Sequence, residues 1–153
     1  FNPYETTSSG TNSVSGTVSN TVPTGATKLK DHHVTFYSAA ASENGGYAGK
    51  NASGYNDGKL TPGQAASSHL DFGTVVYVQT QATGEASYAN GKYFLITDTG
   101  AGKIDGDYDL DIFHDVPNPS DNNKAPYGSS STAKIYVVEK GVSWSTFKAK
   151  YGW

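Results

Sequence analysis

The 153-residue chain contains no cysteine, methionine or arginine, and it has no long run of hydrophobic residues. Without cysteine there is neither a disulfide framework nor a thiolate zinc site. Without about 18 consecutive apolar residues, no membrane span is expected. Charged residues make up only 16% of the chain, and the formal net charge is -3. The eleven lysines are scattered, whereas a nucleic-acid-binding protein needs a clustered basic face, so we expect no nucleic-acid partner.

Glycine and tyrosine are plentiful instead, with 18 and 11 residues. Tyrosine combines a large apolar ring with one polar tip, which suits an exposed groove as well as a core. The length predicts one domain. A composition rich in Ser, Thr and Asn, together with a first residue that is not Met, favours a processed, secreted and extracellular protein. We further expect a monomer with no cofactor.

The residue pattern divides the chain into two parts. Residues 1–27 are polar and lack periodicity, which is typical of a linker or of a strap across a domain. Residues 28–153 contain β-branched and aromatic runs, which predict strands at 33–38, 74–79, 92–97, 110–113 and 133–139. The long, polar connections between these short strands favour a compact all-β barrel.

A short helix is expected at the end of the chain. Trp144, Phe147 and Tyr151 recur at the spacing of one helix face, and Ser143 stands where an N-cap is needed. This helix would follow the last predicted strand directly.

The densest charge in the chain is an acidic stretch at 97–113, which holds five of the 14 acidic residues. Its aspartates at 105, 107, 109 and 111 alternate, so they share one face if the chain is extended. Carboxylates crowded beside a folded core repel one another and lose solvation, which raises the pKa of at least one of them. A carboxylic acid that stays protonated near neutral pH can act as a general acid. The acidic stretch is therefore the candidate site of chemistry.

Three interpretations of the acidic stretch compete. It is a solvated turn between strands, a calcium site, or a site of carbohydrate chemistry in which Asp98 and Asp111 are the working carboxyl groups. An EF-hand beginning at Asp105 is excluded, because the positions that need Gly and Glu hold Leu110 and Val116. A calcium site of another kind stays open, although no metal ligand is included among the expected site residues.

One known family has the same landmarks in the same order. Asp98-Thr99-Gly100, the segment at 102–106 and Asp109-Leu110-Asp111-Ile112-Phe113 resemble the signature of the three-aspartate (3D) domain. Weaker matches lie at 34–38, 72–78, 125–128 and 135–138, so the resemblance covers roughly residues 33–139. Proteins with this domain are similar to the membrane-bound lytic transglycosylase A type and to bacterial muralytic proteins. Their barrel is shared by family-45 endoglucanases and by expansins.

The resemblance implies a six-stranded double-psi β-barrel, here with long loops and a short C-terminal helix. It also implies cleavage of the MurNAc–GlcNAc β-1,4 bond of peptidoglycan, either as a muramidase or as a lytic transglycosylase. By that analogy Asp111 is the general acid and Asp98 is its electrostatic partner. The residues expected to contact the substrate are Tyr37, Lys103, Tyr108 and Asp109.

The chain departs from the family pattern in two places. Asp98 and Asp111 are 13 positions apart, slightly more than in the family, so Asp109 is an alternative to Asp111 as the acid. The family has its first aspartate in the segment that here is Ala65-Ala66-Ser67-Ser68, so this aspartate is missing. Its loss favours a mechanism with a single acid, or a base recruited from Glu43, Asp57 or Asp71. The alternative functions are a β-1,4-glucanase on the same barrel and an expansin-like wall-binding protein without hydrolysis.

Overall fold

The computed structural model describes residues 16–29, 32–39, 47–80, 88–100, 109–114 and 130–153, and only the backbone of residues 32, 33, 109 and 130–132. Seven strands occur in this part of the chain. In order they are β1 (Thr27–Lys28), β2 (His32–Tyr37), β3 (Gln64–Ala66), β4 (Val75–Gln79), β5 (Lys92–Asp98), β6 (Asp109–Phe113) and β7 (Ser130–Glu139). A 3-10 turn, η4 (Tyr55–Gly58), precedes β3, and the helix α1 (Trp144–Tyr151) follows β7.

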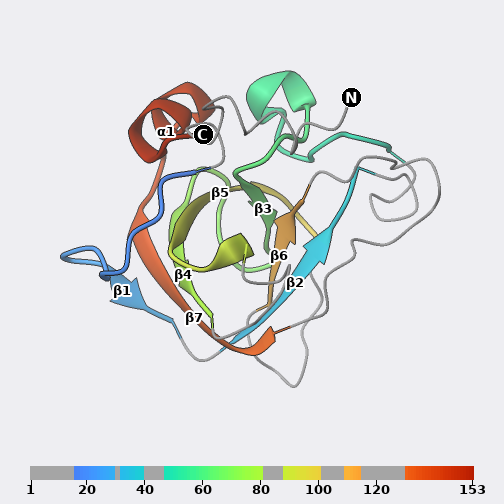
Figure 1. Cartoon of the computed structure of the whole chain (residues 1–153). Coiled ribbons are helices and arrows are strands. Elements are labelled where there is room, and N and C mark those ends of the chain that lie inside the picture. Colours follow the sequence, from blue (N-terminus) through green and yellow to red (C-terminus); the bar gives the residue numbers. More distant parts are fainter. Residues whose placement is uncertain (1–15, 30–31, 40–46, 81–87, 101–108, 115–129) are drawn as a thin grey trace, which may run out of the picture.

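The strands form one mixed sheet in the order β1-β7-β2-β6-β3-β5-β4. The pairs β2–β6 and β3–β5 are parallel and the other pairs are antiparallel. Strand β7 also pairs with β4, so the sheet curls until its last strand meets β7 (Figure 1). Helix α1 and turn η4 lie next to each other at one edge of this curled sheet.

The all-β class and the short C-terminal helix are confirmed. The described sheet has seven strands rather than six, because the two-residue β1 pairs with β7. The double-psi arrangement of the connections stays a prediction. No helix in the described part is long and apolar enough to cross a membrane.

The core lies inside the curl of the sheet and beneath α1. Phe94, Leu95 and Ile96 on β5 are fully buried, and Phe147 of α1 belongs to the same cluster. Ser143 caps α1 as expected, because its hydroxyl accepts a hydrogen bond from the Thr146 backbone N–H at 3.3 Å. The cap and the buried face of α1 together place the helix against the sheet.

The part of the N-terminal segment that the structure describes lies against the C-terminus. The backbone N–H groups of Gly16 and Thr17 donate to the carbonyls of Gly152 and Tyr151. The Trp153 ring lies where a side chain at Gly16 or at Gly63 would have to be, which leaves no room for a Cβ atom at either position. The division into 1–27 and 28–153 stays a prediction.

Two strands were not predicted from the sequence, the two-residue β1 and the three-residue β3. Gln64, Ala65 and Ala66 carry no β-branched or aromatic side chain, so nothing in their local preference indicates a strand. They are extended because they are buried between β5 and β6 and hydrogen-bond to both. This short strand is the one on which the candidate site depends.

Candidate functional site

A row of four residues crosses four neighbouring strands at one end of the sheet. Asp98 pairs with Ala66, Ala66 pairs with Asp111, and Asp111 pairs with Thr35. Residues paired across neighbouring strands place their side chains on the same face of a sheet. The Thr35 hydroxyl accordingly donates a hydrogen bond to Asp111 Oδ1 at 3.0 Å. Two carboxyl groups that are 13 positions apart therefore flank one alanine.

An irregularity in the β3–β5 pairing brings Asp98 into this row. Ala65 pairs with Ile96, but Ala66 pairs with Asp98, so the register skips Thr97. A bulge of this kind redirects a side chain to the other face of the sheet. Thr97 instead donates a hydrogen bond to Gln64 Oε1 at 2.7 Å.

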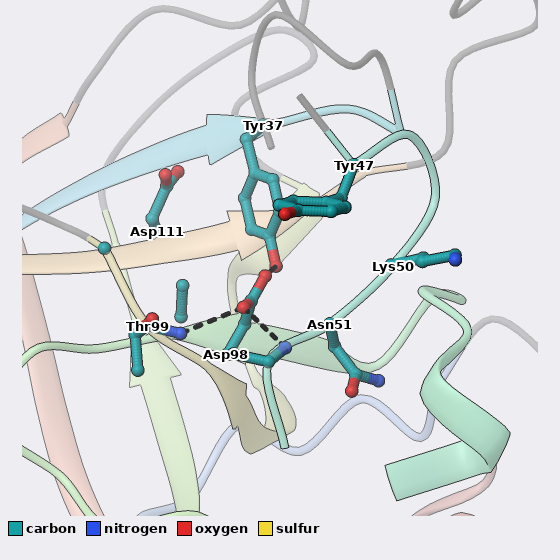
Figure 2. Close-up of a pocket in the computed structure, with 10 residues that line it drawn as sticks. Tyr37, Tyr47, Lys50, Asn51, Asp98, Thr99 and Asp111 are labelled. Carbon is teal, nitrogen blue, oxygen red and sulfur yellow. Dashed lines mark hydrogen bonds between the residues drawn. The ribbon is translucent and has the colours of Figure 1, made fainter. Parts of the chain in front are cut away.

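Three residues of this row form the floor of a cleft of about 680 Å³ (Figure 2). Asp98, Ala66 and Asp111 all line it, and the hydroxyl end of Tyr37 meets the Asp98 carboxyl group in Figure 2. The remaining lining residues are Tyr47, Lys50, Asn51, Ala52, Thr99 and Gly100. Alanine at the centre of the row leaves the floor of the cleft open between the acids.

Asp98 is a buried carboxyl group held in one orientation. Its side chain belongs to a residue only 8% exposed, and Oδ1 accepts hydrogen bonds from the backbone N–H groups of Ala52 at 2.9 Å and Thr99 at 3.0 Å. Oδ2 accepts a third from the Tyr37 hydroxyl at 3.0 Å. Three donors from three separate segments stabilise a carboxylate and fix its position.

Tyr37 is a hydrogen-bond donor that stays protonated. Burial raises the pKa of Tyr37 far above its usual range, and the negative charges of Asp98 and Asp111 raise the same pKa further. Its ring also packs edge-on against Phe113, with 5.7 Å between the ring centroids. Tyr37 lines the cleft, and its hydroxyl is engaged with Asp98, so its contact with a substrate stays a prediction.

Asp111 differs from Asp98 in its exposure. It is half-buried, it lines the cleft, and it accepts its hydrogen bond from the side chain of Thr35. The two carboxyl groups of the row thus occupy different environments: Asp98 is buried and held by three donors, and Asp111 is half-buried at the cleft surface.

The rim of the cleft opposite Asp111 is a turn at Tyr47–Lys50, with Gly49 in the left-handed region. The turn is anchored through its backbone, since the Gly49 N–H donates to the Ala39 carbonyl at 2.8 Å and its carbonyl accepts from the Leu60 N–H at 2.9 Å. Tyr47 is 69% exposed and Lys50 is exposed. Both side chains can therefore meet a ligand without first losing a structural role.

Some expected site residues are not placed by the structure. Lys103, Tyr108 and the candidate base Glu43 lie outside the described residues, as does the side chain of Asp109. The other two candidate bases, Asp57 and Asp71, are exposed and do not line the cleft. Within the described chain, no three His, Asp or Glu side chains are grouped closely enough to hold a metal ion.

Sequence reasoning missed Ala52 and Lys50. Ala52 contributes only a backbone N–H, which has no signature in the sequence. Lys50 is one of eleven scattered lysines, and nothing near it in the chain indicates a groove. Tyr47 was detectable only as one of several tyrosines in predicted loops.

Comparison with known proteins gives little further information. No protein-family model and no curated protein matches the chain. The chain resembles a solved structure of the E. coli lytic transglycosylase MltA, an apo form of a variant, with 16% identity and a TM-score of 0.39. The match covers 60% of this chain and 27% of that one, so the chain spans about a quarter of its length. A likeness at this level does not bear on function, which rests on the cleft.

Proposed function

We propose that this chain cleaves the glycan strand of peptidoglycan at the MurNAc–GlcNAc β-1,4 bond, with Asp111 as the general acid. The observation that carries the proposal is the pair of carboxyl groups on one cleft floor in unlike environments. Such a pair is the arrangement that separates an acid from a charged partner in glycoside-cleaving sites. The resemblance of 98–113 to the three-aspartate signature supports the same assignment. The parallel pairs β2–β6 and β3–β5 are compatible with a double-psi barrel.

In this mechanism Asp111 is protonated when substrate binds. The nearby negative charge of Asp98 favours that protonated form, because two like charges repel each other. Asp111 then transfers its proton to the glycosidic oxygen while positive charge develops at the sugar C1. Asp98, already fixed by three donors, stabilises this charge without having to reorient.

The surroundings of Asp98 favour attack on the sugar C1 by a hydroxyl of the substrate itself rather than by the Asp98 carboxylate. Asp98 and Asp111 are separated by strand β3. A retaining nucleophile needs a carboxylate oxygen that can bond to the sugar C1. Both oxygens of Asp98 are also engaged by donors of the protein. We therefore favour attack by the C6 hydroxyl of the muramic sugar, whose proton returns to Asp111, and the product is a 1,6-anhydro sugar.

The rim supplies a reason to favour peptidoglycan over an uncharged glucan. Among the described lining residues, Lys50 is the one cation, and it stands on the same rim turn as the exposed Tyr47 (Figure 2). Peptidoglycan carries carboxylates on its stem peptides, whereas cellulose carries none. Since peptidoglycan lies outside the cytoplasm, the proposal includes a secreted protein, and we propose that it acts as a monomer.

The deciding experiment is mass spectrometry of soluble products from purified peptidoglycan, with cellulose in parallel. Anhydro-muropeptides are expected from peptidoglycan and nothing from cellulose. Muropeptides with reducing ends would show that water attacks instead of the C6 hydroxyl, so that the reaction is hydrolysis. Soluble glucans from cellulose would make the chain a glucanase, and no product from either polymer would leave an expansin-like binding protein.

The acid is tested by Asp111→Asn, which keeps an oxygen to accept the Thr35 hydrogen bond. The variant should lose about 10²- to 10⁴-fold in turnover with an unchanged circular dichroism spectrum and melting temperature. Asp71→Asn is the matched control, because Asp71 is exposed and does not line the cleft, and it should keep wild-type turnover. Wild-type turnover by Asp111→Asn would exclude Asp111 as the acid.

A further inference from the structure

A second hollow of about 610 Å³ lies between η4 and the start of α1. It shares no lining residue with the Asp98–Asp111 cleft. Two aromatic residues, Tyr55 and Trp144, line it together with polar residues and two glycines. The polar lining residues are Asn56, Asp57, Ser143 and Ser145. We call this feature the Trp144 hollow.

The two rings of the Trp144 hollow are held rigidly. Both are partly buried and pack against the main hydrophobic core. The Trp144 ring also lies against Phe147, with ring centroids 5.6 Å apart and planes inclined by 31°. An aromatic surface already fixed by packing loses little entropy when a ligand lies on it.

The opposite wall of the hollow is a turn in the left-handed region, which Asn and Asp adopt more readily than other non-glycine residues. Asn56 and Asp57 have φ values of 56° and 54°, and among the described residues no other non-glycine residue has a positive φ. Asn56 is secured, because its amide donates to the Lys59 carbonyl at 3.0 Å and to the Thr61 hydroxyl at 3.1 Å. Asp57 is exposed, and in the described part of the chain its carboxylate has no hydrogen bond or ion pair.

We infer that the Trp144 hollow is a second glycan-binding site, which takes one pyranose unit of a β-1,4-linked polysaccharide. The apolar face of the sugar lies on Trp144, and its hydroxyls donate to the Asp57 carboxylate. An aromatic platform beside a free acceptor suits a ligand that has one apolar face and many hydroxyl groups. This site does not depend on Asp111 and goes beyond the proposed cleavage.

The segment 50–57 connects the two sites. Asn51 and Ala52 line the Asp98–Asp111 cleft, and Gly54–Asp57 line the Trp144 hollow. The Asn51 amide donates to the Tyr55 carbonyl at 2.8 Å, which ties the two halves of the segment together. A polymer held in the hollow therefore stays close to the cleft.

Tryptophan fluorescence tests the site directly. The chain has two tryptophans, and Trp153 is 5% exposed with its indole N–H donated to the Tyr93 carbonyl, so a ligand-dependent change reports on Trp144. Asp111→Asn would be titrated with soluble muropeptide, chitin and cellulose oligosaccharides, so that no turnover interferes. A saturable change with at least one series is expected, and the series that binds identifies the sugar. No change with any series would overturn the inference.

Asp57→Gly separates a binding role from a structural one. Glycine relieves the positive φ, so the variant should melt at a higher temperature than the wild type while binding glycan at least about tenfold more weakly. Asp71→Gly is the control for loss of an exposed carboxylate and should leave binding unchanged. Unchanged binding by Asp57→Gly would overturn the role of Asp57. Binding without cleavage by the wild type would refute only the proposed function, and cleavage without a fluorescence change would refute only the second site.

Discussion

At the scale of single residues, Lys50 and Lys59 form a natural matched pair. Their backbones face each other across an isolated antiparallel bridge, and both side chains are exposed. Only Lys50 lines the Asp98–Asp111 cleft. A difference between variants at the two positions therefore reports on the ligand rather than on the fold.

We expect Lys50→Gln to raise KM for a carboxylate-bearing peptidoglycan fragment about fivefold, because an exposed ion pair contributes about 1 kcal/mol. Its KM for a fragment with amidated carboxylates should equal that of the wild type. Lys59→Gln should leave both values unchanged. Steady-state kinetics with the two fragments checks this, and an equal effect of the two lysine substitutions would rule out recognition by Lys50.

At the scale of elements, β3 serves the core and the cleft with consecutive residues. Ala65 is fully buried in the main core cluster, whereas Ala66 lines the cleft between the two carboxyl groups. Successive side chains on a strand point to opposite faces. The same change made at each position should therefore have two different consequences.

Ala65→Val should lower the free energy of unfolding by about 1–3 kcal/mol, because extra methyl groups overpack a dense core. Ala66→Val should also cost stability, because Ala66 is buried in a second cluster with Tyr37 and Phe113. In addition it should fill the floor between Asp98 and Asp111, which reduces turnover at least about tenfold by displacing the substrate. Urea unfolding and the product assay would be run on both variants. If Ala66→Val kept full activity, the substrate would not lie over β3.

At the scale of the whole molecule, a contact between α1 and β7 holds the C-terminal helix on the sheet. Lys150 donates to Glu139 Oε2 at 2.8 Å, and the Tyr151 hydroxyl donates to the same oxygen. These hydrogen bonds, first that of Lys150 and then that of Tyr151, lower the pKa of Glu139 below its ordinary 4.5. A lowered pKa in the folded state means that the contact stabilises the fold above pH 4.5 and is lost as the pH falls through the folded-state value.

Glu139→Gln should accordingly lower the free energy of unfolding by about 1 kcal/mol at pH 7, since both partners are partly exposed. At pH 3 the difference from the wild type should be smaller, because the contact is lost as the wild-type carboxylate takes up a proton. Lys148→Gln, an exposed change in the same helix turn, should be neutral at both values. Thermal melts at the two pH values test this, and a deficit of equal size at both would show that the charge of Glu139 is not responsible.

The amino-acid sequence by itself determined the elements whose residues carry a strong local preference. Five β-branched and aromatic runs became β2, β4, β5, β6 and β7, and the spacing of Phe147 and Tyr151 with the Ser143 cap became α1. It also indicated Asp98, Asp111 and Tyr37, which the structure brings to one cleft. Each of these predictions rests on periodicity or on a motif, so each can be made without knowing which strands pair.

Only the tertiary structure decided which residues stand between and around the two acids. Ala66 separates them because β3 is extended by its neighbours rather than by its own propensity. Ala52 reaches Asp98 through a backbone N–H, and the Trp144 hollow is formed by segments nearly 90 positions apart in the chain. Contacts of this kind depend on long-range register and on main-chain groups that every residue possesses. A sequence pattern therefore does not predict these contacts, which form only when the sheet has curled.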